Sequence, residues 1–180
     1  MSKEINRIMI DIETTGLRPG CHVLSIGAVF FNLDEGVSQD KRFYERIFFE
    51  HRFGLNTDPD TMLWWRDQPK EVIEETFGGT ELPRNVICRF LNFLLKGKDN
   101  GAERQLFSKH AQFDFPILEA YMEKFFLGDA WSHREINCYY TLANQIRRIV
   151  KPKFEGRKHT ALDDAVNQAT HCVELLRFLN

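Results

Sequence analysis

Residues 23–32 (VLSIGAVFFN) constrain the fold more than any other segment, because they form an almost unbroken apolar run. A strand with one face in water would carry polar residues at alternate positions, whereas a continuous run is typical of a strand covered on both faces. Residues 7–13 and 41–49 are rich in isoleucine or aromatic side chains and also predict strands, and residues 105–110 are a shorter candidate. The chain is therefore predicted to form a sheet with layers on both faces.

The predicted helices lie between and after these strands. Prolines suit the first turn of a helix, and they open three helices at Pro59, Pro69 and Pro83. Further helices are predicted over residues 115–126, 137–150 and 160–179. This order of elements predicts an α/β fold, a mixed β-sheet flanked by α-helices, in a single domain that spans residues 1–180.

Length, charge and cysteines narrow the class of protein. A chain of 180 residues buries roughly two-thirds of the surface that its unfolded form exposes. A net charge of −2 excludes a generic basic nucleic-acid coat but allows a local basic groove. The four cysteines form no CxxC pair, so the sequence has no zinc motif of that kind. Because the sequence shows no apolar leader or membrane-length run, we expect a soluble, intracellular, cytoplasmic protein with no membrane partner.

Two carboxylates, Asp11 and Glu13, stand at the end of the first predicted strand. Their side chains leave the same face, roughly 6–7 Å apart, because strand side chains alternate with a period of two. Like charges at this distance repel unless water or a cation separates them, and Mg²⁺ and Mn²⁺ prefer oxygen ligands. The pair therefore indicates a metal site, although a DxE pair also occurs by chance in roughly every second chain of this length.

Asp114 lies at the predicted junction between the fourth strand and the next helix. One interpretation is an N-cap, since an Asp before a helix that Pro116 opens accepts hydrogen bonds from unpaired backbone N–H groups. The other is a carboxylate at the end of a neighbouring strand that faces Asp11. The residues around Asp114 do not decide between the two.

Residues 159–165 (HTALDDA) carry a histidine and two adjacent acids at the start of the last predicted helix. Thr160 and Asp163 have the spacing of a capping box, with Asp in place of Glu, which gives Asp163 a structural role. Asp164 points about 100° away from Asp163 and is left to face the sheet. His159 precedes the helix, and a side chain that titrates near pH ~6.5 suits a general base at neutral pH.

Together these segments resemble the DEDDh branch of the DnaQ-like 3′→5′ exonucleases, which have a ribonuclease H-like fold. The first motif of that branch, DxE followed by Thr and Gly, is present in residues 11–16 (DIETTG). The second motif ends in Phe-Asp, as residues 113–114 do. The third pairs a His with an Asp five residues later, as His159 and Asp164 do.

Within this branch the chain is similar to the compact phage exonuclease A and mycobacterial exoribonuclease-like group. Residues 61–68 (TMLWWRDQ), 113–118 (FDFPIL) and 131–136 (WSHREI) carry this similarity, which extends over about residues 7–176. One departure is His110, because the second motif of the branch usually has Asn four residues before its Asp.

The resemblance implies a metal-dependent exonuclease that hydrolyses single-stranded RNA or DNA from its 3′ end to 5′-mononucleotides. Its metal ligands would be four carboxylates that hold two Mg²⁺ or Mn²⁺ ions roughly 4 Å apart: Asp11, Glu13, Asp114 and Asp164. His159 would be the general base that activates the attacking water. Contacts with the substrate are expected from five residues: Thr14, Thr15, Leu17, His110 and Phe113.

Two alternatives from other classes remain, together with an open choice of substrate. A nucleic-acid-binding module on the same fold would lack catalysis, and a proofreading subunit would act beside a polymerase. The choice between RNA and DNA depends on a contact with the 2′-hydroxyl, which no motif reports. A homodimer is expected because related exonucleases often dimerise.

Two further segments have both a structural and a functional interpretation. Residues 147–158 (RRIVKPKFEGRK) contain six basic residues and one acid, and form either a solvated stretch or a surface that steers phosphates. Trp64 and Trp65 are adjacent, so they cannot share one helix face. At least one is expected in the core, and the other is a candidate for a substrate wall or a subunit contact.

Overall fold

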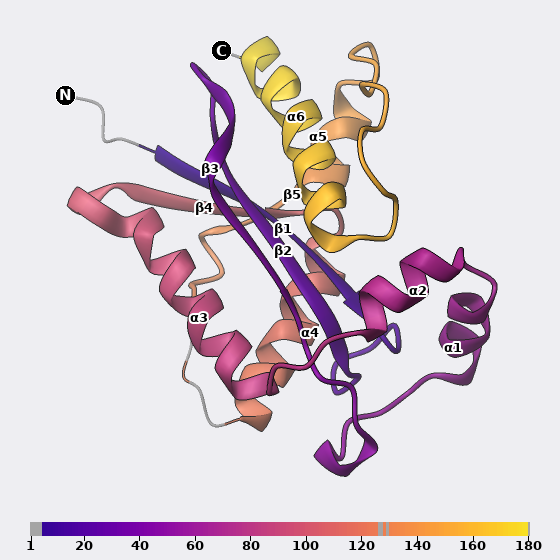
Figure 1. Cartoon of the computed structure of the whole chain (residues 1–180). Coiled ribbons are helices and arrows are strands. Elements are labelled where there is room, and N and C mark those ends of the chain that lie inside the picture. Colours follow the sequence, from indigo (N-terminus) through magenta and orange to yellow (C-terminus); the bar gives the residue numbers. More distant parts are fainter. Residues whose placement is uncertain (1–4, 126–127, 129, 180) are drawn as a thin grey trace.

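The computed structural model describes residues 5–125, 128 and 130–179, and its centre is a five-stranded mixed sheet (Figure 1). The strands are β1 (Ile5–Thr14), β2 (Val23–Asn32), β3 (Gly36–Arg46), β4 (Glu103–Ser108) and β5 (Ile136–Cys138). They lie in the order β3-β2-β1-β4-β5. β1 is antiparallel to β2 and parallel to β4, while β2 and β3 are antiparallel and β4 and β5 are parallel.

Helices cover both faces of this sheet (Figure 1). Within the described residues they are α1 (Pro59–Arg66), α2 (Lys70–Phe77), α3 (Pro83–Leu95), α4 (Ala111–Lys124), α5 (Tyr139–Gln145) and α6 (Ala161–Leu179). Short 3₁₀ helices span His51–Phe53 and Lys96–Gly101. α3 and α4 pack on one face, and α5 and α6 on the other. The predicted α/β fold, a mixed sheet flanked by helices, is confirmed.

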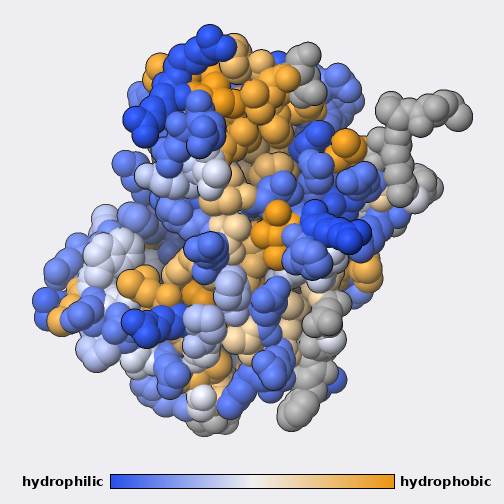
Figure 2. Space-filling model, turned by 180° about the vertical axis from the view of Figure 1, so that it is seen from behind, coloured by the Kyte–Doolittle hydropathy of each residue, from blue (hydrophilic) through white to orange (hydrophobic). Residues whose placement is uncertain are grey.

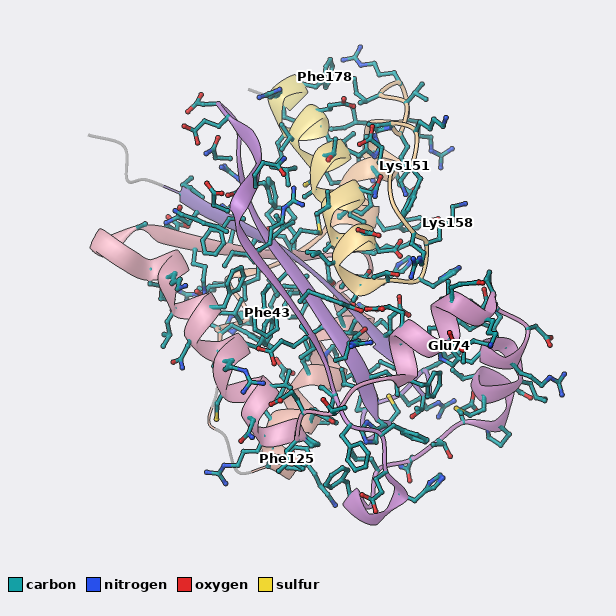
Figure 3. The ribbon with its side chains drawn as sticks, in the orientation of Figure 1. Phe43, Glu74, Phe125, Lys151, Lys158 and Phe178 are labelled. Carbon is teal, nitrogen blue, oxygen red and sulfur yellow. The ribbon has the colours of Figure 1, made fainter. Side chains whose placement is uncertain are left out.

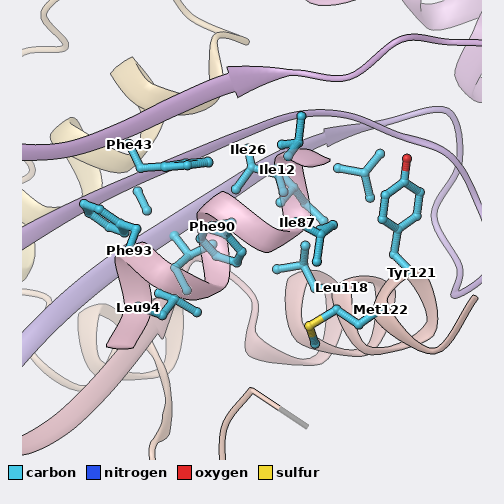
Figure 4. Close-up of a cluster of buried hydrophobic side chains, with 14 of the residues drawn as sticks. Ile12, Ile26, Phe43, Ile87, Phe90, Phe93, Leu94, Leu118, Tyr121 and Met122 are labelled. Atoms are coloured by element: carbon cyan, nitrogen blue, oxygen red, sulfur yellow. The ribbon is translucent and has the colours of Figure 1, made fainter. Parts of the chain in front are cut away.

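The sheet is buried on both faces, as the apolar run in β2 predicts. All residues of β2 except the last are buried. On one face, Ile12 and Ile26 of the sheet pack with Phe90 of α3 and Leu118 of α4 (Figure 4). On the other face, Met9 packs in a cluster with side chains of α5 and α6. Full burial of one such side chain contributes roughly 1.5–3 kcal/mol, so packing on both faces stabilises the sheet.

Several predicted element boundaries are wrong. The segment predicted as a helix over residues 137–150 starts inside β5, and α5 ends at Gln145. A strand of three residues shows no detectable alternation, and it forms because β4 offers a parallel partner. The helix predicted from residue 115 begins at Ala111, because Pro116 lies inside α4 and does not open it. Its predicted end at Phe126 lies outside the described residues.

The other strand predictions differ from the structure mainly in their limits. The strand predicted over residues 41–49 spans Gly36–Arg46, and the one predicted over residues 105–110 spans Glu103–Ser108. Pairing with β2 extends β3 back toward the turn, beyond the aromatic residues that mark it in the sequence. The strand predicted over residues 23–32 is confirmed at both ends.

One glycine sets the distance between α6 and the sheet. Gly27 in β2 pairs with Asp11 in β1. A Cβ atom at Gly27 would lie 2.2 Å from the carbonyl carbon of Ala161, the first residue of α6. Because glycine has no Cβ, the N-terminal end of α6 can lie directly against the backbone of β2.

The surface carries an apolar region at one end of the molecule. Seen from behind, hydrophobic side chains gather at the upper end of the view, where α5 and the segment after it lie (Figure 2). Val150, in that segment, is 81% exposed.

Among the described helices, none combines the length and the apolar character that a membrane span requires. The homodimer stays a prediction.

Candidate active site

Three acidic side chains meet at the end of β1. Asp11 and Glu13 are two residues apart in this strand, so they leave it on the same face. Asp164 comes from the first turn of α6. Carboxylate oxygens from the three residues lie within 4.8 Å of one another. The close approach of α6 at Gly27 therefore brings together acids from opposite ends of the sequence.

The pKa values of these acids are raised. Burial raises the pKa of Asp11 well above its usual value, and repulsion from neighbouring carboxylates adds to the rise. Burial, followed by repulsion from Asp164 and Asp114, raises the pKa of Glu13 to about 8. Burial also raises the pKa of Asp164. A divalent cation among these groups would relieve both their repulsion and their loss of hydration.

Asp114 is a fourth acid close to this cluster. It lies in the first turn of α4 and is 3% exposed, and burial raises its pKa to about 7. It is near enough to Asp11 and Glu13 to raise the pKa of both. The N-cap interpretation is wrong, because α4 begins before Asp114 and its N-cap residue is His110.

His159 lies directly beside Asp164. Among the described residues it is the only one other than glycine with a positive φ, 62°. Its backbone N–H donates to Oδ2 of Asp164 at 2.7 Å. Its ring meets the ring of Trp64 edge-on, with centroids 4.9 Å apart and planes at 86°. These two contacts fix the loop in a conformation that costs a non-glycine residue on the order of 1–3 kcal/mol.

The predicted capping box at the start of α6 is wrong. The buried hydroxyl of Thr160 has no hydrogen-bond partner within the described part of the chain, and Asp163 instead accepts a 2.7 Å hydrogen bond from the backbone N–H of Arg157. The reason is a turn at Gly156, with φ 89°, which brings the N–H of Arg157 to this carboxylate. Asp163 therefore stabilises the preceding loop by a hydrogen bond, and Asp164 lies with the other acids.

A hollow of about 430 Å³ opens beside the acids. This volume is within the range of roughly 300–1,000 Å³ that is typical of small-molecule sites. The lining side chains are apolar, acidic or hydroxyl-bearing, and come from Ile12, Glu13, Thr14, Leu17, Asp58, Asp60, Thr61, Trp64, Trp65 and Phe113. The predicted contacts Thr14, Leu17 and Phe113 are thus at the hollow, and Leu17 is 70% exposed.

Two other predicted contacts lie elsewhere. Thr15 is fully buried, and its backbone N–H and its hydroxyl donate to the carbonyl oxygens of His22 and Asn56, each at 2.9 Å. It therefore holds the turn after β1. His110 is exposed, and its ring packs against Tyr140. Neither residue lines the hollow.

The two adjacent tryptophans have different environments. Trp65 is buried, and its indole N–H donates to the carbonyl oxygen of Thr14 at 2.8 Å. Trp64 is 43% exposed and contacts His159. The expectation that one tryptophan belongs to the core is confirmed.

Two residues beside the acids carry no motif and were not predicted. Gln168 is 2% exposed, and its Nε2 donates to Oδ1 of Asp11 at 2.7 Å. Lys109 is exposed after β4 and partly offsets the rise that burial causes in the pKa of Glu13 and Asp164. The one available signal for Gln168 is its i, i+4 spacing from Asp164, which puts both on the same face of α6.

A mixed sheet with Asp11, Glu13 and Asp164 together at the end of β1, and with Asp114 and His159 close to them, is typical of 3′→5′ exonucleases with a ribonuclease H-like fold. A family model described as the 3′-5′ exoribonuclease Rv2179c-like domain matches residues 6–176, and the chain belongs to this family. The protein is therefore a 3′→5′ exonuclease, as the sequence motifs imply. No curated protein matches the chain.

Solved nuclease structures have a similar fold. Cell-death related nuclease 4 (CRN-4) gives a TM-score of 0.67 at 15% identity, over 98% of this chain and 66% of that chain. The nuclease domain of 3′hExo, a DEDDh family member bound to rAMP, gives 0.67 at 13% identity, over 96% and 92%. S. pombe Pop2p in its Mg²⁺- and Mn²⁺-bound form gives 0.60 at 12% identity, over 94% and 82%. The chain thus spans slightly less than two-thirds of CRN-4, and at these identities the likeness confirms the fold alone.

Proposed function

We propose that this exonuclease releases 5′-mononucleotides from the 3′ end of single-stranded RNA. The observation that carries the proposal is the meeting of Asp11, Glu13 and Asp164 within 4.8 Å, where Glu13 also forms part of the wall of the hollow. The family description, an exoribonuclease, favours RNA over DNA, and the rAMP bound to 3′hExo is in line with this choice.

We further propose that Asp11, Glu13, Asp114 and Asp164 hold two Mg²⁺ or Mn²⁺ ions. The donor set fits, because both ions prefer carboxylate oxygens and four acids here repel one another. The Mg²⁺ and Mn²⁺ bound to Pop2p support this assignment. When bound, such ions stabilise the negative charge that develops on the phosphate and on the leaving 3′-oxygen.

His159 is the general base in this proposal. Its backbone N–H bonds Asp164, and its ring contacts Trp64 in the wall of the hollow, so the imidazole has both the acids and the hollow close by. There it accepts a proton from the attacking water, a contribution that is typically worth about 10²–10⁴ in rate.

The hollow receives the 3′-terminal nucleoside in this proposal. Leu17 and Phe113 offer apolar contacts for the base, and Thr14 adds a hydroxyl oxygen whose hydrogen is donated to the carbonyl oxygen of Gly16. None of the described residues that line the hollow is basic, while Glu13, Asp58 and Asp60 are acidic. This lining suits the free hydroxyls of a nucleoside and disfavours a terminal phosphate.

The test uses 5′-labelled single-stranded RNA and DNA of one sequence, with Mg²⁺, Mn²⁺ or EDTA. We expect a ladder that shortens from the 3′ end with metal, is absent with EDTA and in Asp11→Ala, and forms faster from RNA. Faster degradation of DNA would overturn the choice of RNA but not the reaction. Absence of Mg²⁺ and Mn²⁺ binding in calorimetry would favour the competing proposal, a nucleic-acid-binding module without catalysis.

A further inference from the structure

An exposed pair of aromatic rings lies close to the acids. His110 precedes α4, and Tyr140 lies in the first turn of α5. Their ring centroids are 4.7 Å apart with the planes tilted by 49°, and Tyr140 is 48% exposed. The backbone N–H of Tyr140 donates to the carbonyl oxygen of Lys109 at 3.1 Å, which ties α5 to the turn after β4. The rings therefore face solvent from a fixed position.

One exposed lysine adjoins this pair, and another lies near the acids. Lys109 and Lys151 are both exposed, and both are near enough to Asp164 to offset part of the rise that burial causes in its pKa. Lys151 belongs to the segment of residues 147–158, in which six basic residues accompany one acid. Figure 3 shows Lys151 and Lys158 along the loop that runs beside α6 to its first residue. Positive charge therefore continues from the acids along this side of the molecule.

The aromatic pair and the α1 wall of the hollow lie on different sides of β1, and Phe113 of α4 also lines the hollow. In the sheet, β4 and β5 lie on one side of β1, and β2 lies on the other. Lys109 follows β4 and Tyr140 follows β5. The hollow has α1 as a wall, and α1 packs against β2 through Trp65 and Leu24. A nucleic acid that crosses the acids from the hollow would therefore arrive at the aromatic pair.

We infer that four residues, called here the upstream surface, bind the nucleotides on the 5′ side of the terminal dinucleotide: Lys109, His110, Tyr140 and Lys151. The inference rests on the proposed function, which places the 3′-terminal nucleoside in the hollow. The aromatic rings stack on bases without regard to sequence, and the lysines neutralise the flanking phosphates. Strands of several nucleotides are therefore better substrates than dinucleotides.

The experiment compares Tyr140→Ala with wild type on two RNA substrates that share the same 3′ end, a ten-nucleotide strand and a dinucleotide. Loss of one base stack lowers affinity by about fivefold or more, so kcat/KM for the longer strand should fall by at least that factor. The value for the dinucleotide should stay within about twofold. Tyr140→Phe keeps the ring and should behave as wild type.

Lysine variants provide a second, independent comparison. Lys109→Ala should lower kcat/KM more for the longer substrate than for the dinucleotide, whereas Lys96→Ala should affect neither substrate. Lys96 is exposed and follows α3, which packs on the opposite face of the sheet from α6. The proposed upstream surface would be wrong if Tyr140→Ala lowered kcat/KM equally for both substrates, or did not lower it for the longer one.

A measurement of RNA binding can show whether the upstream surface or the proposed function is wrong. Fluorescence anisotropy of the labelled ten-nucleotide RNA, with Ca²⁺ in place of Mg²⁺, should show the same loss for Tyr140→Ala as the kinetics. If wild type cleaves neither RNA with Mg²⁺ or Mn²⁺ and Tyr140→Ala still weakens binding, the proposed function fails and the surface stands. If both substrates are cleaved and binding is unchanged, the surface fails and the function stands.

Discussion

His159 combines a strained backbone with two contacts that hold it against the acids. Its N–H bonds Asp164 through the main chain, so the side chain can be removed without losing that bond. We expect His159→Ala to lower kcat by roughly 10²–10⁴-fold, because in the proposed mechanism the imidazole accepts the proton. Single-turnover kinetics would measure the loss, and calorimetry should show Mg²⁺ affinity close to that of wild type.

His133→Ala is the matched control for this variant, since His133 is exposed in the turn before β5. It should retain full activity. Wild-type turnover in His159→Ala would show that His159 is not the general base.

The raised pKa of Glu13 predicts how the metal-free protein responds to pH. The folded pKa is about 8, against an ordinary value of 4.5. As pH rises from 4.5 toward 8, the unfolded chain ionises at Glu13 while the folded protein resists ionisation, so stability is lost over this window. Asp114, with a pKa of about 7, acts in the same direction. In EDTA, Tm should therefore fall between pH 5 and pH 8.

Calorimetry with and without Mg²⁺ checks this prediction. Mg²⁺ should reduce the fall in Tm, because a cation stabilises the charged carboxylates. Glu13→Gln in EDTA should also show a smaller fall, since the amide does not ionise. A Tm in EDTA that is flat or rises across the window would mean that burial does not raise these pKa values.

For single residues, the sequence predicts the positions of the acids better than the side chains that contact them. Alternation along a strand is enough to put Asp11 and Glu13 on one face, and the spacing on a helix separates Asp163 from Asp164. The contact between Gln168 and Asp11 depends on where α6 crosses the sheet, which no local pattern contains. The same holds for Tyr140, whose contact with His110 joins the first turn of α5 to the N-cap of α4.

Among the elements, α6 owes its position against the sheet to one residue of another element, Gly27 in β2. Gly27→Ala would place a Cβ 2.2 Å from the carbonyl carbon of Ala161, so α6 must move away from β2. We expect lower thermal stability, by about 1–3 kcal/mol as in other overpacked cores, together with weaker Mg²⁺ binding, because Asp164 moves with the helix. Calorimetry would measure both effects.

Gly128→Ala is the control for this substitution, because among the described residues none places an atom within 4 Å of a Cβ there. It should leave stability and Mg²⁺ binding unchanged. Wild-type values in Gly27→Ala would show that α6 does not need this close contact.

The elements that the sequence predicts well are those with a strong local signal. The apolar run of β2 and the proline at the start of α3 are signals of this kind. The predictions fail at β5 and at the start of α4, where pairing with β4 and the course of the chain after β4 decide the structure. Local propensity carries no information about either contact.

For the whole molecule, we propose that residues 1–180 form one exonuclease domain. α1 and α2 extend from the sheet, but Trp65 joins them to β2 through Leu24 and to the end of β1 through its bond to Thr14. Unfolding should therefore be a single cooperative transition, with equal calorimetric and van't Hoff enthalpies. Two resolved transitions would mean that these helices form a separate unit.

The charge distribution of the whole molecule predicts a strong dependence on salt. The net charge of −2 repels a polyanion at long range, yet the segment of residues 147–158 carries six basic residues, of which Lys151 lies near Asp164. Each phosphate that these residues neutralise should contribute a slope of about −0.7 to the plot of log affinity against log salt. The double variant Lys151→Ala, Lys158→Ala should flatten that slope for ten-nucleotide RNA, whereas Lys96→Ala should leave it unchanged. If the slope in wild type is already near zero, the repulsion by the acids cancels the attraction by this segment, and recognition of the substrate depends on the hollow and the bound metal alone.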